Sequence, residues 1–514
     1  MTNPKTDSQT ERQTDPHRPH YHFLPPYGWM NDPNGLIFMG GRYHLFYQYN
    51  PHGNVWDTIH WGHASSANLF HWTHHPLALA PEVGGIDGDG VFSGCAVLNG
   101  QTPTLMYTAH RFLEGGAEHQ VLALATSNEE MLEWVKHPAN PVLEAESARL
   151  ALTGFRDPFV WREGDGWHLA VGAGLEHGPG LVLHYTSNNL LEWDYRGELL
   201  RAALEPDLMP EPNAAPGLEK RLGFWECPCF FPLKDGGNLA YILLLSRIPQ
   251  RDVHYFVGQY DGSSLHPALE GQLDVNGCFY APQTFQDSTG RTLCFGWLTE
   301  DGVAGVGLPR LESAWNGVMS LPRVLSLCGG RLHQTPAPEL EGLRDAELLN
   351  GEMALEDGIQ QVLPVQGDAL ELELTLKLEG LKSFSVALRR SPDGLPGERE
   401  ETWLHFDAST RVLRLDRSRS SLHGSSMLLS QLELPLEAEE TLTLRIFLDA
   451  STLEVFAAGL TLSSRIYPSR ADSRGVALLA RGERPSARVK IWSLEDVWKE
   501  EVWKEEVWKE TGSS

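Results

Sequence analysis

Three acidic residues, Asp32, Asp157 and Glu226, occupy similar local settings although they lie far apart in the 514-residue chain. Each closely follows a bulky apolar or aromatic residue, and each comes shortly before a candidate β-hairpin. A pair of carboxyl groups that flank a bond is the arrangement used for glycoside hydrolysis. The residue types therefore favour carbohydrate chemistry, provided that the fold brings these acids together.

The neighbours of the acids predict different roles. Asp32 lies between Asn31 and Asn34, whose side chains can hydrogen-bond its ionised form. Glu226 follows Phe-Trp and precedes Cys-Pro, an apolar setting that favours its protonated form. This difference assigns a nucleophile and a proton donor. Asp157, next to Arg156, is expected to stay ionised and to bind substrate hydroxyls.

The acids belong to an internal repeat. Residues Asp32, Ser93, Asp157, Glu226 and Tyr280 are separated by 61, 64, 69 and 54 positions, and each begins or lies within a short motif that precedes a hairpin. A second series, ending in tryptophans at positions 72, 134 and 193, runs in step with the first. A period of this length in a strand-rich chain is typical of a β-propeller. Five units predict five blades, and equivalent residues should then converge on the central channel.

A different pattern begins near residue 351. Leucines at 370, 372, 374, 376 and 378 alternate with polar residues, as in a strand with one buried and one solvated face. Further short strand candidates follow, which predicts a β-sandwich. With 50 Gly and 33 Pro and few long helical patterns, the whole chain is expected to be all-β. The predicted division is a disordered tail (1–20), a five-bladed propeller (21–335), a linker (336–350), a β-sandwich (351–495) and a repetitive tail (496–514).

The repetitive tail carries the sequence VWKE three times with a period of five residues. This period places the tryptophans on no single face of a helix or a strand. The tail is therefore expected to be weakly structured. Removal of everything after Leu494 should leave activity and melting temperature nearly unchanged.

Composition excludes several classes of partner. Acidic residues outnumber basic ones by 68 to 41, a net charge of −27 that disfavours binding to nucleic acid and to anionic membranes. No apolar run is long enough for a transmembrane helix, and the first 19 residues lack the apolar core of a secretion signal. Six scattered cysteines form no disulfide framework, and Cys227-Pro228-Cys229 has no second pair to complete a zinc site. A cytoplasmic protein without a metal is expected.

The repeated motifs resemble those of the invertase and fructanase family, glycoside hydrolase family 32. The resemblance covers about residues 20 to 495 in order. Its motifs are residues 29–35 (WMNDPNG), 60–64 (HWGHA), 92–94 (FSG), 155–158 (FRDP), 225–228 (WECP), 279–285 (FYAPQTF), 315–323 (WNGVMSLPR) and 449–456 (DASTLEVF).

The resemblance implies a propeller followed by a sandwich, and retaining hydrolysis of β-fructofuranosides without a metal or organic cofactor. Asp32 would be the nucleophile, Glu226 the acid/base and Asp157 the stabiliser of the transition state. The fructose site would be lined by Asn31, Gln48, Trp56, Phe92, Ser93, Arg156, Tyr280 and Trp297. Sucrose is the first expected substrate.

Two positions depart from the family pattern. Family members usually have Asp at the position of Cys278 and often an acid or amide at that of Cys229, so substrate preference and pH optimum stay open. The open alternatives are an exo-acting fructanase, a fructosyltransferase, an enzyme for phosphorylated sucrose, and a sugar-binding propeller without catalysis. Arabinan-cleaving enzymes also use a propeller with three acids, but their motifs match less well. The oligomeric state is not predicted.

Overall fold

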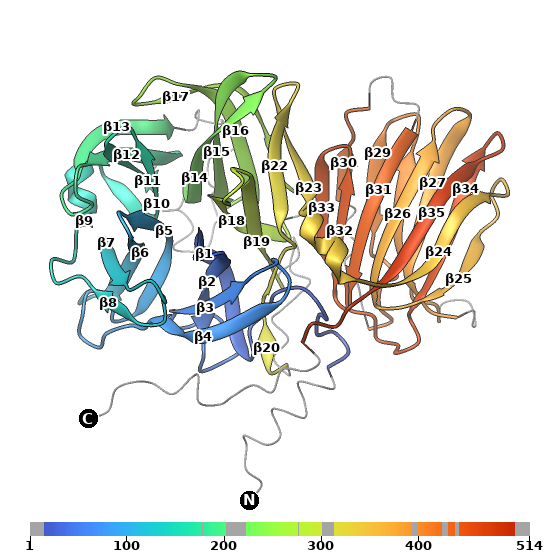
Figure 1. The fold of residues 1–514 in the computed structure, drawn as a ribbon, viewed down its shortest axis with the longest axis horizontal. Coiled ribbons are helices and arrows are strands. Elements are labelled where there is room, and N and C mark those ends of the chain that lie inside the picture. The colour runs from blue at the N-terminus through green and yellow to red at the C-terminus, as the bar shows by residue number, and fades with distance from the viewer. Residues whose placement is uncertain are drawn as a thin grey trace, which may run out of the picture.

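The computed structural model describes residues 15–176, 178–201, 223–275, 277–300, 313–392, 398–423, 430–436 and 441–498. In these ranges the chain is almost entirely β-structure, with two short 3-10 helices, η1 (Ala145–Ala148) and η3 (Pro338–Leu343). Figure 1 shows two domains side by side, a propeller in blue to yellow and a sandwich in orange to red. No helix in the described ranges is long and apolar enough to span a membrane.

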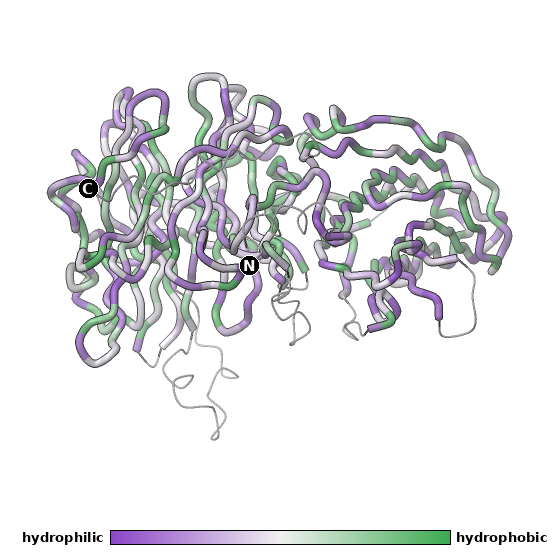
Figure 2. Tube along the Cα trace, turned by 90° about the horizontal axis from the view of Figure 1, so that it is seen from below, coloured by the Kyte–Doolittle hydropathy of each residue, from purple (hydrophilic) through white to green (hydrophobic). Residues whose placement is uncertain are grey.

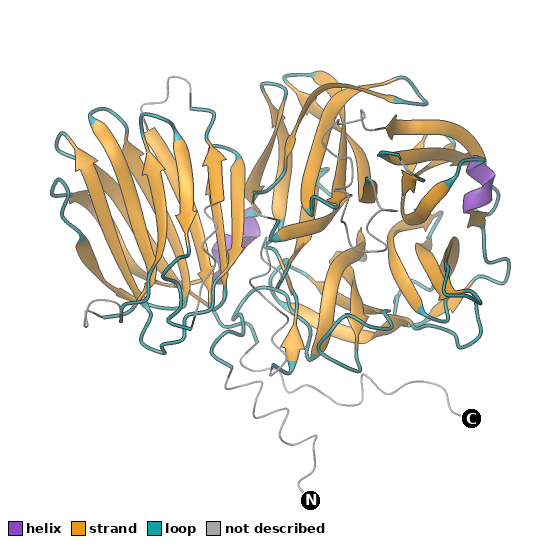
Figure 3. Cartoon of the chain, turned by 180° about the vertical axis from the view of Figure 1, so that it is seen from behind, coloured by secondary structure: helices purple, strands orange, loops and turns teal. Residues whose placement is uncertain are grey.

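Five antiparallel sheets surround the centre of the first domain (Figure 3). The first two are β1 (Gly28–Met39), β2 (Arg42–Asn50), β3 (His60–Ser66) and β4 (Trp72–Leu79), then β5 (Gly90–Asn99), β6 (Thr102–Phe112), β7 (Glu118–Ser127) and β8 (Trp134–Lys136) with β9 (Leu143–Glu144) beside β7. The third and fourth are β10 (Leu152–Glu163), β11 (Gly166–Leu175), β12 (Gly180–Ser187) and β13 (Asp194–Arg201), then β14 (Phe224–Asp235), β15 (Asn238–Ile248), β16 (Asp252–Tyr260) and β17 (Leu265–Gln272). The fifth is β18 (Phe279–Gln286), β19 (Thr292–Leu298), β22 (Arg323–Cys328) and β23 (Arg331–Pro336), with β21 (Val318–Met319) beside β19.

The five sheets close into a ring. Each innermost strand contacts the next in the order β1, β5, β10, β14 and β18, and β18 returns to contact β1. The ring is also joined by β20 (Trp315–Asn316), which pairs in parallel with β1 although it lies late in the domain's sequence. The predicted five-bladed propeller is confirmed.

The tryptophan series marks a repeated turn between the third and fourth strands of a blade. In the first blade the N–H of Leu69 donates to Ser66 Oγ (2.8 Å), and Trp72 Nε1 donates to the Leu69 carbonyl (3.0 Å). The third blade repeats both bonds at Leu190, at 3.0 and 2.9 Å. Leu69 and Leu190 also share a left-handed backbone, with φ of 72° and 66°. The sequence repeat is therefore a repeat of turn chemistry.

Two six-stranded sheets form the second domain and confirm the predicted sandwich. One is β24 (Arg344–Ala354), β35 (Ser486–Leu494), β26 (Ala369–Lys377), β31 (Thr441–Asp449), β32 (Thr452–Ala457) and β33 (Leu460–Arg465). The other is β25 (Gln361–Gln366), β34 (Gly475–Gly482), β27 (Leu381–Arg390), β28 (Thr402–Asp407), β29 (Val412–Asp416) and β30 (Ser430–Glu433). Figure 2 shows hydrophobic and hydrophilic residues mixed along the strands, as expected where one face of each sheet is buried.

Two expectations about this domain differ from the structure. Helix η3 lies within the segment expected to be a linker (336–350), and β24 begins there, so the sandwich begins at Arg344. The alternation in β26 buries the leucines from 370 to 376 as predicted, but Glu371 on the opposite face is also fully buried. Its carboxylate accepts from Arg344 Nε (2.8 Å) and Arg445 Nε (2.6 Å), because a charge is buried only when it is paired.

The chain before β1 runs between the two domains and is held there by the sandwich. Asp449, at the end of β31, accepts from the backbone N–H groups of His20, Tyr21 and His22 at 2.6, 2.9 and 2.9 Å. The prediction of disorder up to residue 20 is therefore wrong for residues 15–20. Residues 1–14 lie outside the described ranges.

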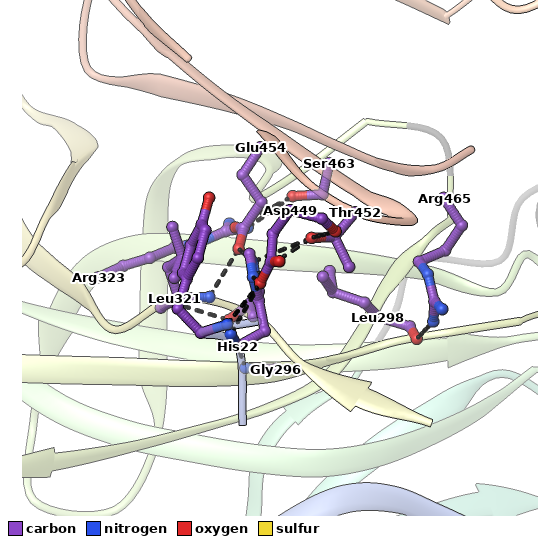
Figure 4. Close-up of polar contacts among 12 residues, drawn as sticks. His22, Gly296, Leu298, Leu321, Arg323, Asp449, Thr452, Glu454, Ser463 and Arg465 are labelled. Carbon is purple, nitrogen blue, oxygen red and sulfur yellow. Dashed lines mark hydrogen bonds and ion pairs between the residues drawn. The ribbon is translucent and has the colours of Figure 1, made fainter. Parts of the chain in front are cut away.

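A buried charged network joins the domains (Figure 4). The two ring nitrogens of His22 contact Asp449 Oδ2 (2.8 Å) and Glu454 Oε1 (3.1 Å). Glu454 also accepts from Arg323 Nη2 of the propeller (2.7 Å) and from the N–H of Leu321 (2.6 Å). Burial opposes a charge on His22, but the hydrogen bonds to its two carboxylate partners outweigh burial and raise its pKa. Removal of one partner from such a buried network strongly destabilises the folded protein.

The first two residues of the first VWKE copy, Val497 and Trp498, pack against the propeller. Trp498 is only 9% exposed and belongs to the propeller core, and its Nε1 donates to the His22 carbonyl (3.0 Å). The N–H of Val497 donates to the His20 carbonyl (2.9 Å). The expectation that everything after Leu494 is weakly structured is wrong for these two residues. The other two copies lie outside the described ranges.

Candidate active site

The innermost strand of every blade is irregular at the same place. In β1 the pairing with the second strand shifts register between Met30 and Pro33. Equivalent shifts occur at Phe92/Gly94 in β5, Arg156/Phe159 in β10, Glu226/Cys229 in β14 and Tyr280/Gln283 in β18. A β-bulge redirects side chains away from the regular alternation, and bulges are common beside active sites. The five bulges coincide with the five repeated motifs of the sequence.

Three of these bulges contain a non-glycine residue with a left-handed backbone. The φ angles are 63° at Asp157, 49° at Cys227 and 48° at Ala281. Such angles are unfavourable for these residue types and persist only where the surrounding structure enforces them. The same strained turn therefore recurs in three adjacent blades, at the end of the channel where the acids gather.

Asp32 is held by residues from the first and second blades. Its Oδ1 accepts from Asn31 Nδ2 (3.1 Å), and its Oδ2 accepts from Ser93 Oγ (2.6 Å). Gln48 links the two donors, accepting from Asn31 Nδ2 (2.8 Å) and donating to Ser93 Oγ (2.5 Å). Four predicted site residues thus form one hydrogen-bond network that fixes the direction of the Asp32 carboxylate.

The protonation of Asp32 differs from the prediction. Desolvation raises its pKa to about 6, although hydrogen bonds from Ser93 and Asn31 oppose the rise, and the charge of Glu226 adds to it. The neighbouring asparagines were expected to favour the ionised form. The hydrogen bond from Asn31 does act in that direction, but removal of water around the carboxyl group outweighs it, so the net shift of the pKa is upward.

Asp157 lies close to Asp32, and Cys227 contacts both carboxylates. The Cys227 thiol lies 3.6 Å from Asp32 Oδ2 and 3.5 Å from Asp157 Oδ2, and the Cys227 N–H donates to Asp157 Oδ2 (3.0 Å). Desolvation raises the pKa of Asp157 to about 7; Arg156 opposes this shift, and the charges of Glu226 and Asp32 add to it. The expectation that Asp157 simply stays ionised is therefore wrong near neutral pH.

Glu226 is bound on both oxygens. Its Oε1 accepts from Arg156 Nε (3.1 Å) and Nη2 (2.6 Å), and its Oε2 accepts from the Tyr280 hydroxyl (2.6 Å). The Arg156 guanidinium lies over the ring of Phe224, 3.8 Å from its centroid. The prediction of an apolar setting for Glu226 is wrong. The adjacent blades supply the Arg156 guanidinium and the Tyr280 hydroxyl, which the local sequence does not show.

Aromatic residues border the acids. Trp297 packs edge-on against Trp29, and Trp56 against Phe92, with ring centroids 5.7 and 6.1 Å apart. Trp56 is 53% exposed, whereas Trp297 is buried. Trp297 Nε1 has no hydrogen-bond partner among the described residues, so it is a donor that a bound ligand can use. The structure thus joins Asn31, Gln48, Ser93, Arg156 and Tyr280 to the acids through hydrogen bonds. Phe92 adjoins Ser93, and the rings of Trp56 and Trp297 contact Phe92 and Trp29.

Sequence reasoning missed three residues that shape this site. Trp29 Nε1 donates to Asn31 Oδ1 (3.1 Å), Thr108 Oγ1 accepts from the N–H of Asp157 (2.9 Å), and the Cys227 thiol lies between two carboxylates. Trp29 and Cys227 adjoin predicted residues and were signalled by the motifs that contain them. Thr108 lies on a second strand outside every repeated motif, so no sequence signal marked it.

The described residues contain no group of three or more His, Cys, Asp or Glu side chains suited to hold a metal ion. The Cys-Pro-Cys motif directs its two thiols to different places. Cys227 faces the carboxylates, whereas Cys229 is buried with its thiol 3.4 Å from the Pro282 carbonyl.

Comparison with known protein families matches both domains. The description "Glycosyl hydrolases family 32 N-terminal domain" matches residues 22–336, and "Glycosyl hydrolases family 32 C terminal" matches residues 339–493.

Individual relatives resemble nearly the whole chain. A sucrose-6-phosphate hydrolase of Zymomonas mobilis is 34% identical over 93% of this chain and 92% of its own length. A raffinose invertase of Escherichia coli is 32% identical over 90% of this chain and 92% of its own length. The solved structure of a mutant Bombyx mori β-fructofuranosidase in complex with sucrose is 29% identical, with a TM-score of 0.76 over 96% of this chain and 97% of its own. This chain is a fructofuranosidase and belongs to glycoside hydrolase family 32.

Proposed function

We propose that this enzyme releases fructose from the non-reducing end of β-D-fructofuranosides by double displacement, with sucrose as a substrate. The observation that carries the proposal is the pairing of two differently bound carboxyl groups. Asp32 is oriented by Ser93 and Asn31, whereas Glu226 is held by Arg156 and Tyr280. Two carboxyl groups in distinct settings are the arrangement of a nucleophile and an acid/base in retaining glycosidases.

In the first step Asp32 attacks the anomeric carbon of fructose while Glu226 protonates the leaving oxygen. In the second step Glu226 removes a proton from water, which attacks the fructosyl-enzyme and frees Asp32. The pKa of Asp32, about 6, leaves this carboxyl group ionised at neutral pH, as a nucleophile requires.

Asp157 is proposed to stabilise the transition state by accepting hydrogen bonds from fructose hydroxyls. Asn31, Gln48, Trp56, Phe92, Ser93, Arg156, Tyr280 and Trp297 are proposed to line the fructose site. The Nε1 donor of Trp297 and the exposed face of Trp56 support this, since sugar sites combine apolar rings with a few directed polar groups.

The test is fructose release from sucrose by the wild type and three variants. Asp32→Ala should abolish turnover, and Glu226→Gln should lower kcat about 10²- to 10⁴-fold, with a smaller loss on aryl fructosides whose leaving group needs no proton. The control is Glu270→Gln, an acid with a largely exposed side chain on β17 outside the site. Undiminished turnover by Asp32→Ala would exclude Asp32 as the nucleophile.

A second candidate substrate is sucrose carrying a phosphate on its glucose unit. Two observations favour it: the Zymomonas relative is named sucrose-6-phosphate hydrolase, and the Arg251 guanidinium lies 5.8 Å from the ring centroid of Tyr280, beside Glu226. Comparison of kcat/KM for sucrose and sucrose 6-phosphate in the wild type and Arg251→Gln separates the two substrates. A selective loss on the phosphorylated sugar would favour the second.

The same substrate panel addresses the remaining alternatives. Release of fructose from long fructans at rates above those for sucrose would identify an exo-fructanase, and longer products would identify a fructosyltransferase. A protein that binds sugar without any turnover would be a non-catalytic propeller. We also propose a cytoplasmic location, which the six free cysteines support.

A further inference from the structure

The tail segment that docks on the propeller begins at Glu495, two residues before the first VWKE copy. The Glu495 carboxylate lies 3.4 Å from His71 Nε2, in the turn between β3 and β4. The Asp496 carboxylate contacts His20 Nδ1 (3.2 Å) and accepts from the N–H of Trp498 (3.1 Å). With the backbone bond from residue 497 to the His20 carbonyl, each residue from 495 to 498 contacts either residues 20–23 or the first blade.

The sequence repeats this whole docked segment and not only its VWKE part. Residues 495–499 read EDVWK, and residues 500–504 and 505–509 both read EEVWK. The acid that contacts His71, the acid that contacts His20, the valine and the tryptophan therefore all recur in register. The single change, Asp496 to Glu in the later units, preserves the carboxylate. The tail thus carries three copies of one docking unit, of which the first is seen bound.

The surface that receives the first unit is called here the acceptor site, and it consists of residues 20–23, His71 and His74. The indole of Trp498 lies between two rings, with its centroid 6.2 Å from that of Phe23 and 5.8 Å from that of His74. Its Nε1 donates to the His22 carbonyl, and the residue is 9% exposed. A buried tryptophan whose N–H is satisfied is the typical anchor of a protein or peptide interface.

The acceptor site is cationic where the unit is anionic. Burial opposes a charge on His20, but the hydrogen bond to Asp496 and the charges of Asp449 and Asp368 raise its pKa to about 9. His20 is therefore protonated at neutral pH. A glutamate in the place of Asp496, as in the second and third units, offers this cation the same charge.

Chain connectivity makes the first unit the ligand of its own acceptor site. Strand β35 ends at Leu494, and the N–H of Glu495 donates to the Leu343 carbonyl (2.9 Å), so the first unit enters the site directly from the strand. Binding of the second unit within the same chain loops out five residues, which forfeits the contacts of the first unit and adds a loop-closure cost. The second and third units are therefore surplus ligands in their own chain.

We propose that the acceptor site is a peptide-binding site for Glu-(Asp/Glu)-Val-Trp units, and that its partner is the tail of a second copy of this chain. An acceptor site that its own first unit has left captures a surplus unit of the neighbouring copy. Exchange of identical elements between copies is a low-cost route to association. This binding is separate from fructose release, so neither proposal depends on the other.

The first test measures binding of a fluorescently labelled peptide, EEVWKEE, to a full-length acceptor variant that carries Trp498→Ala, Trp503→Ala and Trp508→Ala. This variant keeps the whole chain but supplies no indole from its own tail. Anisotropy should show saturable binding, and excess peptide should raise the Tm of the variant, because a ligand of the folded state stabilises it. The matched peptide EEVAKEE should bind at least about 10-fold more weakly, as expected when an interface loses a buried tryptophan anchor.

The second test uses a whole chain as the donor of the unit. Wild type keeps its first unit on its own acceptor site and carries two surplus units. It should therefore form a complex with the acceptor variant in analytical ultracentrifugation. The matched donor is the double variant Trp503→Ala/Trp508→Ala, which retains Trp498 but has no intact surplus unit and should form no complex.

Absence of EEVWKEE binding, equal binding of EEVAKEE, or equal complex formation by both donors would overturn the proposal. If the acceptor variant does not fold, wild type takes its place, with EEVWKEE carrying a photoreactive benzophenone at its C-terminus. This peptide should crosslink to residues 20–23 or to the first blade near His71, and unlabelled EEVWKEE should block the crosslink whereas EEVAKEE should not. No crosslink at these positions, or equal blocking by both peptides, would likewise overturn the proposal.

Discussion

Ser93 Oγ donates to Asp32 Oδ2 across 2.6 Å, so a residue of the second blade orients the carboxylate on the first. The same hydroxyl accepts from Gln48, which leaves its proton directed at Asp32. This hydrogen bond favours the ionised form of Asp32 against desolvation, which raises its pKa to about 6. The proposed nucleophile is therefore oriented by a contact between units 61 residues apart.

Ser93→Ala should move the acid limb of the pH–rate profile to higher pH. In the proposed mechanism Asp32 attacks as a carboxylate, so kcat/KM should fall as pH drops below about 6. Without the serine hydroxyl the carboxylate loses a donor, its pKa rises further, and protonation begins at higher pH. Profiles of kcat/KM against pH for wild type, Ser93→Ala and Ser93→Thr measure this shift. An unmoved acid limb in Ser93→Ala would refute the coupling, and Ser93→Thr, which keeps the hydroxyl, is the control.

Stability should depend on the proton of His22. Its pKa is raised in the folded protein above the value of 6.5, so its contribution is complete below pH 6.5 and is lost as pH rises through the folded pKa. His22→Gln should lower the free energy of unfolding by about 3–5 kcal/mol at pH 6 and flatten the decline of Tm above pH 6.5.

Asp449 and Glu454, whose pKa values are lowered, make the stability of the same interface depend on pH in the acid range. Their contribution is present above the unfolded pKa values of 3.8 and 4.5 and is lost as pH falls through the lower folded values. Thermal unfolding of wild type and His22→Gln across the pH range is the measurement. Parallel curves above pH 6.5 would show that His22 does not carry the dependence.

Truncation after Leu494 should destabilise the enzyme, because it removes Val497 and Trp498 from their contacts with residues 20–23. The single change Trp498→Ala should cost about 3–5 kcal/mol, typical of a buried tryptophan. A truncation after Trp498 keeps the contacts and is the control. Calorimetric unfolding of the three proteins tests this, and equal Tm values for both truncations would mean that the Trp498 contacts contribute nothing.

Alkylation should label one cysteine and spare activity. Cys328 is exposed, whereas burial raises the pKa of Cys278 to about 12 and that of Cys227 well above its usual value. Thiolates, not thiols, react with iodoacetamide. Mass spectrometry should find a single adduct, absent in Cys328→Ser, and Cys278→Ser should retain most activity. Rapid inactivation that substrate prevents would indicate a reactive thiol in the site.

The repeat period was sufficient to predict the propeller, because each blade repeats the same turn chemistry, as the bonds at Leu69 and Leu190 show. It also predicted which residues converge, since Asp32 and Ser93 occupy equivalent bulges. Protonation could not be predicted locally. Glu226 is surrounded by apolar neighbours in sequence, but its partners Arg156 and Tyr280 come from other blades.

The contacts between domains were hidden for a similar reason. Trp498 lies in a segment whose period matches no regular element, yet one indole fits against Phe23 and the His22 carbonyl. A single docked residue leaves no periodic signal. Glu371 shows the converse case, because alternation marked it as solvated while two arginines from other strands bury it.

The central claim is double displacement through Asp32, and the anomeric form of the first product tests it most directly. Retention places the nucleophile and acid/base carboxyl groups about 5–5.5 Å apart, whereas inversion leaves about 6.5–9.5 Å for a water molecule. The anomeric carbon of fructose carries no hydrogen, so it gives no proton signal of its own. The fructose released from ¹³C-labelled sucrose should therefore be observed by ¹³C NMR before mutarotation. The β-anomer should appear first. First appearance of the α-anomer would contradict the mechanism and remove Asp32 from the role of nucleophile.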